Sequence, residues 1–119
     1  MKNNVVQDKS YAFALRIVKM YQFLSSEKKE YVLSKQLLRA ATSIGANVEE
    51  ALGGQSDKDF LSKISIAYKE ARESHYWIRL LRDSDYLTAK QAESLLSDNE
   101  ELLKIMGSIK KTMKERIGN

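Results

Sequence analysis

The chain of 119 residues is 43% apolar and 30% charged, with a net charge of +4, which suits one soluble domain with a core of its own. Because it contains neither cysteine nor proline, disulfides, zinc knuckles and thiol nucleophiles are excluded, and helices can run without a proline break. Residues 1–10 lack the apolar centre of a signal peptide, and no apolar run reaches the length of a membrane span. We therefore expect a cytoplasmic protein with no membrane partner.

The positive charge is concentrated at the two ends of the chain. Residues 1–26 and residues 108–119 each carry four basic side chains against one acidic side chain, whereas the middle is close to balanced. Basic ends suit a polyanion such as RNA or DNA, although mildly basic helical surfaces also occur without any such partner.

The first predicted helix covers residues 10–24. Its apolar residues are spaced three and four apart, which is the period of one helical face; they are Phe13, Ile17, Tyr21 and Leu24. Ser10 is the predicted N-cap, because its hydroxyl can accept a hydrogen bond from a free backbone N–H. The polar run at 25–29 predicts a short connection.

The second predicted helix covers residues 31–52 and has two adjoining faces. One face is apolar, and the other is made of small residues that include Gly45 and Ala46. A glycine inside a helix costs about 1 kcal/mol relative to alanine, so we expect a neighbouring backbone to approach Gly45 closely. Gly53 and Gly54 are predicted to end the helix by adopting the left-handed conformation.

The third and fourth predicted helices cover residues 57–82 and 89–116. Ser56 is the predicted N-cap of the third helix, and Thr88 with Gln91 forms a capping box at the start of the fourth. The apolar residues of both helices alternate in steps of three and four, which is the pattern of a heptad seam.

Four amphipathic helices joined by short polar connections predict an all-α fold, an antiparallel up-down-up-down four-helix bundle that fills the chain as a single domain, residues 1–119. No strand pattern of period two competes with this prediction. One polar residue, Asn99, falls within the apolar stripe of the fourth helix and needs a polar partner if it is buried.

Residues that would support catalysis or cofactor binding do not occur in the required patterns. There is no glycine-rich phosphate loop and no dinucleotide-binding fingerprint. A di-metal carboxylate bundle needs Glu-x-x-His on two of its helices, but His75 is the only histidine and Arg72 stands three residues before it. We therefore predict no catalytic residue, no metal ion and no cofactor, and interpret His75 as a packed or interface residue.

Two glutamates on the third helix suggest structural ion pairs. Glu70 and Glu73 are three residues apart on one helical face, where both can reach Arg39 or Lys35 of the second helix. Such an inter-helix network explains these carboxylates without acid–base chemistry. The adjacent aromatic pair at 76–77 is expected to fill a core or a subunit interface, in preference to stacking a base.

The segment at 37–51, LLRAATSIGANVEEA, is the most distinctive stretch of the chain. Together with the matching motifs before and after it, which lie at 13–18, 59–60, 66–67, 69–73 and 76–77, it resembles the bacterial four-helix-bundle family of proteins encoded in intervening sequences of 23S rRNA genes. The resemblance covers nearly the whole chain. It implies a homopentamer, a ring of five bundles.

A related branch of that family serves as the accessory protein of diversity-generating retroelements, in which a basic barrel contacts nucleic acid and a reverse transcriptase. By similarity, this protein would have an RNA- or DNA-binding surface. A reverse transcriptase would be its partner if the gene lay in such a retroelement.

Two functions follow from these observations. The first is a non-enzymatic oligomeric binding protein that contacts RNA or DNA through basic side chains; the candidates are Arg16, Lys19, Lys35, Arg39, Lys110, Lys111 and Lys114. The alternative is a structural scaffold that binds another protein through an apolar helical face and has no nucleic-acid role. The candidates for an interface between copies are Gly45, Ala46, Tyr76 and Trp77.

Overall fold

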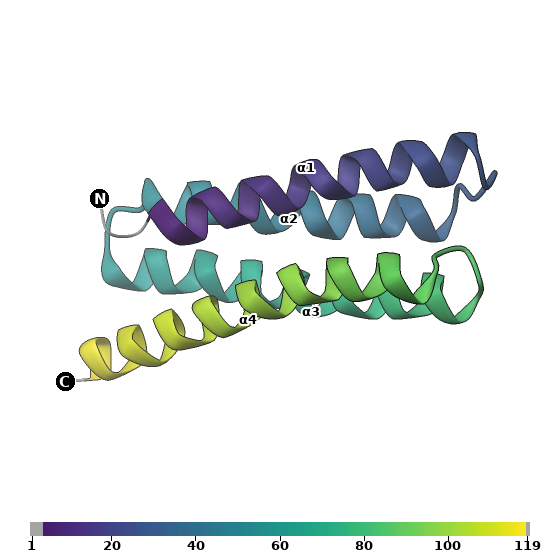
Figure 1. Cartoon of the computed structure of the whole chain (residues 1–119). Coiled ribbons are helices and arrows are strands. Elements are labelled where there is room, and N and C mark those ends of the chain that lie inside the picture. The colour runs from purple at the N-terminus through teal and green to yellow at the C-terminus, as the bar shows by residue number, and fades with distance from the viewer. Residues whose placement is uncertain (1–3, 119) are drawn as a thin grey trace.

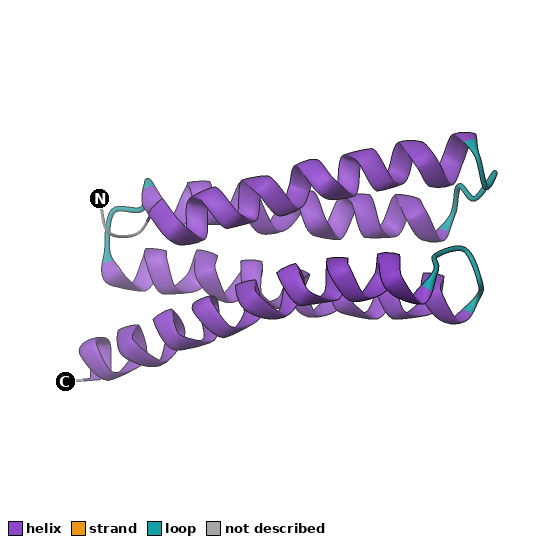
Figure 2. Ribbon diagram, in the orientation of Figure 1, coloured by secondary structure: helices purple, strands orange, loops and turns teal. Residues whose placement is uncertain are grey.

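Four helices make up nearly all of the computed structural model, which describes residues 4–118 (Figure 1). They are α1 (Asn4–Ser26), α2 (Leu33–Leu52), α3 (Asp57–Asp83) and α4 (Ala89–Gly118). Each helix runs antiparallel to the one before it, and the bundle is 50 Å long and about 22 Å across. Figure 2 shows helices and loops and no strand within the described residues. The predicted all-α four-helix bundle is confirmed.

The helices are arranged in a square in chain order. α2 packs between α1 and α3, and α4 packs between α3 and α1, with the α1–α4 interface the smallest of the four. Within residues 4–118, no Cα atom of α1 lies within 8 Å of a Cα atom of α3, because the two helices lie on a diagonal of the square. Their outer faces therefore point in opposite directions.

The core is filled by one apolar stripe from each helix, as the spacing predicts. Its largest fully buried side chains are Phe13, Ile17, Leu24, Leu37, Ile44, Ile64, Ile78, Leu81, Leu95, Leu102 and Met106. Full burial of a side chain of this size contributes about 1.5–3 kcal/mol. This seam is the main source of stability, because it runs along most of the bundle.

The start of α1 differs from the prediction. The helix begins six residues earlier than Ser10, and the Ser10 hydroxyl donates to the Gln7 carbonyl oxygen (3.1 Å) from inside the helix. Ser10 is therefore not an N-cap. The physical reason is Val6, which is buried and extends the apolar stripe by two turns, so that packing holds the earlier residues in the helix.

Gly45 brings the backbones of α1 and α2 together, as predicted. A methyl group in its place would lie 3.6 Å from the Ser10 carbonyl oxygen, in van der Waals contact. The prediction for the end of α2 is wrong in its geometry, because Gly53 has φ −90° and no described glycine has a positive φ. The chain turns instead through a hydrogen bond from Gly54 N–H to the Ala51 carbonyl oxygen (3.0 Å), so close that a side chain at Gly54 would crowd this oxygen.

The predicted caps of α3 and α4 are both present. The Ser56 hydroxyl accepts a hydrogen bond from the Asp59 N–H (3.0 Å). Thr88 Oγ1 accepts from the Gln91 N–H (3.1 Å), while Gln91 Oε1 accepts from the Thr88 N–H (2.9 Å), which is the reciprocal geometry of a capping box.

The start of α2 depends on Glu30, a residue that sequence reasoning placed in a loop. Its buried carboxylate accepts hydrogen bonds from the backbone N–H groups of Val32 (3.1 Å), Leu33 (2.9 Å) and Ser34 (2.7 Å). α2 therefore begins at Leu33, two residues later than predicted. Burial by itself raises the pKa of Glu30, but the hydrogen bonds from these backbone groups outweigh it and leave the pKa below its ordinary value.

We predict that Glu30→Gln lowers the free energy of unfolding by about 1–2 kcal/mol at pH 7, because a neutral amide accepts these hydrogen bonds more weakly than a carboxylate. A carboxyl group with a depressed folded pKa stabilises the protein above its unfolded pKa, and this stabilisation is lost as the pH falls through the folded pKa. Urea unfolding should therefore show the difference at pH 7 and a smaller difference below about pH 4. Glu27→Gln, a neighbouring exposed glutamate, is the control. An equal loss at both pH values would contradict the assignment.

Asn99 is fully buried in the seam, and one of the two polar atoms of its side chain has a hydrogen-bond partner among the described residues. Its Nδ2 donates to the Ala71 carbonyl oxygen (3.0 Å), which ties α4 to α3. Its Oδ1 has no hydrogen-bond partner among the described residues. A buried polar side chain in a heptad seam stabilises one register of the helices at some expense of total stability.

We predict that Asn99→Leu raises the free energy of unfolding by about 1 kcal/mol, because the apolar side chain of similar shape removes the unpartnered oxygen. Asn99→Ala, which leaves a cavity, should lower it. Chemical denaturation followed by circular dichroism measures both. A clear loss of stability in Asn99→Leu would mean that the oxygen has a partner that the isolated chain does not show.

Candidate partner-binding surfaces

The predicted ion-pair network between α2 and α3 is present. Arg39 pairs with Glu70 (3.4 Å) and with Glu73, and Glu73 also accepts a hydrogen bond from Trp77 Nε1 (2.8 Å). These contacts cross-link the two helices and occupy the Arg39 guanidinium within the molecule. Arg39 is therefore poorly placed to bind a phosphate.

The Arg16 guanidinium is also bound by side chains of the same molecule, which the sequence did not reveal. Its Nη1 pairs with Asp98 Oδ2 (2.6 Å), and its Nη2 donates to the Ser94 hydroxyl (2.9 Å), so that it clamps α1 to α4. Binding a phosphate here would require the loss of that clamp.

The other five basic candidates are all lysines, and none forms an ion pair with another described residue. They fall into two groups, because Lys19 and Lys35 lie toward the end where α1 connects to α2, whereas the α4 C-terminus lies at the opposite end (Figure 1). The second group, Lys110, Lys111 and Lys114, occupies the later turns of α4. The structure therefore does not bring the predicted basic residues into one patch.

Large apolar side chains are exposed on two separate faces. The α1 face consists of Val5, Tyr11 and Leu15, of which Tyr11 is 65% exposed and Leu15 47% exposed. The α3 face consists of Ile66, 39% exposed, and Tyr76, 48% exposed. Tyr31 and Val32 are also exposed, in the α1–α2 connection.

The outer face of α4 is different, because its exposed side chains are polar. They include Lys90, Glu93, Ser97, Lys104, Ser108, Lys111 and Glu115. No large apolar side chain of the described part of α4 is among the exposed ones. Among the described residues, the helices that expose large apolar side chains are thus α1 and α3, which are diagonally opposite, whereas α2 and α4 expose none.

The four predicted interface residues lie on two helices, Gly45 and Ala46 on α2 and Tyr76 and Trp77 on α3. Ala46 is exposed on α2, one residue after Gly45, which contacts α1. Tyr76 belongs to the α3 face and meets Trp77 edge to face, with ring centroids 5.0 Å apart, while Trp77 is half-buried. Sequence reasoning missed Tyr11 and Leu15; the signal was their four-residue spacing on the side of the helix opposite to the buried stripe.

His75 joins α3 to α4, in agreement with its interpretation as a packed residue. Its Nε2 lies 2.9 Å from Glu100 Oε2, and its Nδ1 accepts a hydrogen bond from Arg79 Nε (3.0 Å). The part of the chain from 4 to 118 contains no cluster of three metal-ligating side chains. It also contains no helix that is long and apolar enough to cross a membrane.

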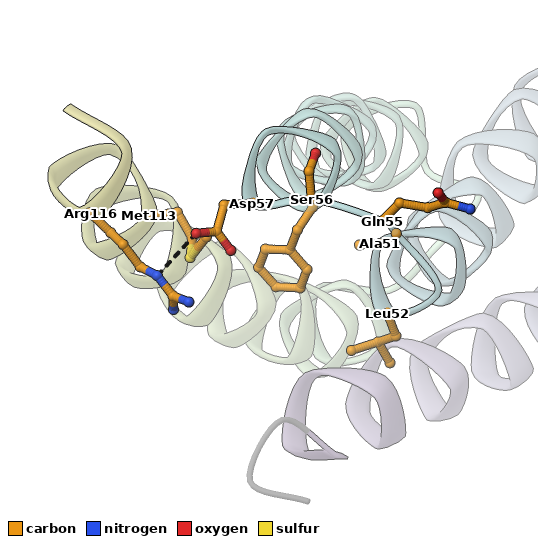
Figure 3. Close-up of a pocket in the computed structure, with 9 residues that line it drawn as sticks. Ala51, Leu52, Gln55, Ser56, Asp57, Met113 and Arg116 are labelled. Atoms are coloured by element: carbon orange, nitrogen blue, oxygen red, sulfur yellow. Dashed lines mark ion pairs between the residues drawn. The ribbon is translucent and has the colours of Figure 1, made fainter. Parts of the chain in front are cut away.

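A pocket of about 350 Å³ opens beside the α2–α3 connection (Figure 3). Its two charged side chains, Asp57 and Arg116, pair with one another (3.1 Å), and the Ser56 hydroxyl is used in the α3 cap. Because these groups are occupied by one another or by backbone, the pocket offers no activated nucleophile with a neighbouring base. Phe60 and Met113 give it an apolar wall.

Comparison with known proteins places the chain in a family. A model of the family described as 23S rRNA-intervening sequence protein matches residues 2–108. The crystal structure of a protein of unknown function from the S23 ribosomal protein family of Bacteroides thetaiotaomicron VPI-5482 is similar, with a TM-score of 0.91 and 53% sequence identity over 93% of this chain and 99% of that chain. No curated protein matches the chain. The resemblance seen in the sequence is thus confirmed, and the chain belongs to the 23S rRNA-intervening sequence protein family.

Proposed function

We propose that this protein is a non-enzymatic binding protein that assembles with copies of itself in the cytoplasm. In this assembly the α1 face of one copy packs against the α3 face of the next. The observation that carries the proposal is the distribution of exposed apolar side chains: they lie on α1, on α3 and in the α1–α2 connection, whereas the outer face of α4 is polar.

Aromatic residues are among those that contribute most to protein interfaces. The α1 and α3 faces include two tyrosines, a leucine and an isoleucine, and removing such apolar area from water contributes about 25 cal/mol per Å². Because the exposed side chains of α4 are polar, α4 is suited to face solvent in the assembly.

The geometry favours a closed ring. The two apolar faces differ in their residues and point in opposite directions from diagonal helices. A contact between two different faces is heterologous, and repeated heterologous contacts form a ring when their rotation closes. A ring of five copies is the size that the family resemblance implies, and we propose that number here.

The same assembly would present its basic side chains many times over. The lysines without an ion-pair partner in the described chain, Lys19, Lys35, Lys110, Lys111 and Lys114, support contact with RNA or DNA, since repeated cations raise affinity for a polyanion. Arg16 and Arg39 are left out of this contact because they are held by acidic side chains.

The alternative, a scaffold for a different protein, uses the same apolar faces. It requires that these faces stay free of other copies of the chain. The state of the protein in solution therefore distinguishes the two functions.

We predict that Leu15→Glu breaks the assembly, because it places a charge in the middle of the α1 face. Light scattering should give about 68 kDa for the wild type, five times the chain mass of 13.6 kDa, and 13.6 kDa for the variant. The helix content should not change, since Leu15 lies outside the core.

Ser97→Glu, which adds the same charge to the polar outer face of α4, is the matched control and should keep the wild-type mass. A wild-type mass of one chain would contradict self-assembly and favour the scaffold. An unchanged mass in Leu15→Glu would show that the α1 face is not the contact.

A further inference from the structure

We propose that the groove between α3 and α4 binds a single strand of nucleic acid, with its phosphates on two arginines and a base against a tyrosine. The groove has a volume of about 220 Å³, and its lining residues are Tyr68, Arg72, His75 and Arg79 of α3 and Leu103 of α4. The inference rests on the proposed contact with RNA or DNA and assigns that contact to a site with arginines that the sequence had not suggested.

Neither of the two arginines of this groove forms an ion pair with a carboxylate of the described chain. Arg72 is exposed and forms no ion pair with a described residue. Arg79 donates its Nε to His75 Nδ1 (3.0 Å), and its guanidinium carbon lies 5.9 Å from the centre of the Tyr76 ring. Its terminal nitrogens have no partner in the described chain, so they can donate two parallel hydrogen bonds to a phosphate.

A third cation reaches the groove from α4. Lys110 Nζ lies 4.4 Å from the centre of the Tyr68 ring, a cation–π contact that holds the ammonium group at the edge of the groove. Gly107 of α4 faces Tyr68; a methyl group there would be 3.6 Å from Tyr68 Cε1, in ordinary van der Waals contact. Lys114 follows Lys110 by four residues, hence on the same side of α4.

Two acidic side chains lie near these cations. Asp83, four residues after Arg79, interacts with it electrostatically but is already paired with Arg82 (2.7 Å). Glu100 faces the groove residues from α4, but its carboxylate already contacts His75 Nε2 (2.9 Å). The α3–α4 groove thus has a surplus of positive charge. Few carboxylates there would compete with a phosphate for the N–H donors of the arginines.

The α1–α4 side of the bundle provides a contrast. Its surface pockets also contain basic residues, yet Arg16 pairs with Asp98 (2.6 Å) and Lys9 pairs with Glu101 (3.2 Å). Apart from Lys19, which also lines one of these pockets, the basic side chains there join α1 to α4. The guanidinium groups without an acidic partner, those of Arg72 and Arg79, lie on the other side of α4.

The walls of the groove favour a single strand over a duplex. Tyr68 and Leu103 supply an aromatic ring and an apolar surface, on which an unpaired base can stack. In a duplex the bases are paired and stacked within the helix, so they would leave these two side chains unused and offer only phosphates. The preferred probe is therefore a short single-stranded poly(U) RNA.

The test is a titration of labelled poly(U) and of a duplex DNA by fluorescence anisotropy over a salt series. We expect Arg72→Ala/Arg79→Ala to bind poly(U) at least about 10-fold more weakly than the wild type at low salt. The slope of log affinity against log salt should fall by about 0.7 for each lost phosphate contact, hence by about 1.4 for the pair. Lys58→Ala/Lys90→Ala removes two exposed lysines outside the groove and so provides a control with the same change in net charge.

Arg72→Lys/Arg79→Lys should restore most of the salt slope and only part of the affinity, because lysine keeps the charge but not the two parallel hydrogen bonds. Both arginine sites are exposed, so circular dichroism should not change. An equal loss in the arginine and lysine-control variants would overturn the groove assignment while leaving the nucleic-acid contact standing. Absence of binding by the wild type at low salt would overturn the contact itself, and equal binding of duplex DNA would overturn the preference for a single strand.

Discussion

The structure depends on the burial of one apolar stripe from each of four long helices around a single seam. Phe13 and Ile17 of α1 belong to the same core cluster as Ile44, Ile64 and Leu102 from the other helices, and all five are essentially inaccessible to water. Because such a seam needs only one side of each helix, it leaves the outer sides free to differ. Any recognition of a partner by this protein depends on the differences between those outer sides.

The charged residues divide into those that hold the bundle together and those that remain for a partner. Arg16 with Asp98 joins α1 to α4, and Arg39 with Glu70 and Glu73 joins α2 to α3. The groove between α3 and α4 is held differently, by His75 and by the side chain of Asn99. This leaves Arg72 and the end of Arg79 unpaired within the described chain, so binding there does not compete with the contacts that join the helices.

Much of the fold could be predicted from the sequence because helical period and capping chemistry are local. The four stripes, the Ser56 cap and the Thr88–Gln91 box are each specified by residues within a few turns. The pair of Arg39 with Glu70 could also be foreseen, because two neighbouring helices present those faces to one another once the bundle is assumed. The prediction that Ser10 is an N-cap was wrong because a serine before an apolar run is typical of a cap. The burial of Val6 determines where the helix begins.

The features that escaped prediction depend on contacts between distant segments. Glu30 reads as one more charge in the run Glu27-Lys28-Lys29-Glu30, and its role as a cap needs the left-handed turn at Lys29 (φ 56°), which brings its carboxylate under the first turn of α2. The α3–α4 groove combines residues of two helices, so a count of charge along the chain cannot reveal it. The outer apolar face of α1 escaped for a related reason, since exposure is known only after the core is assigned.

Cross-linking tests most directly the claim that two different outer faces join one copy to the next. The chain has no cysteine of its own, so Leu15→Cys and Ile66→Cys can be introduced singly or together and treated with a short bismaleimide. We predict a ladder of covalently linked chains on a denaturing gel for the doubly substituted chain and single chains for each single substitution, because the outer faces of α1 and α3 point in opposite directions within one copy. Linked pairs from Leu15→Cys alone, or no ladder from the double substitution, would contradict it.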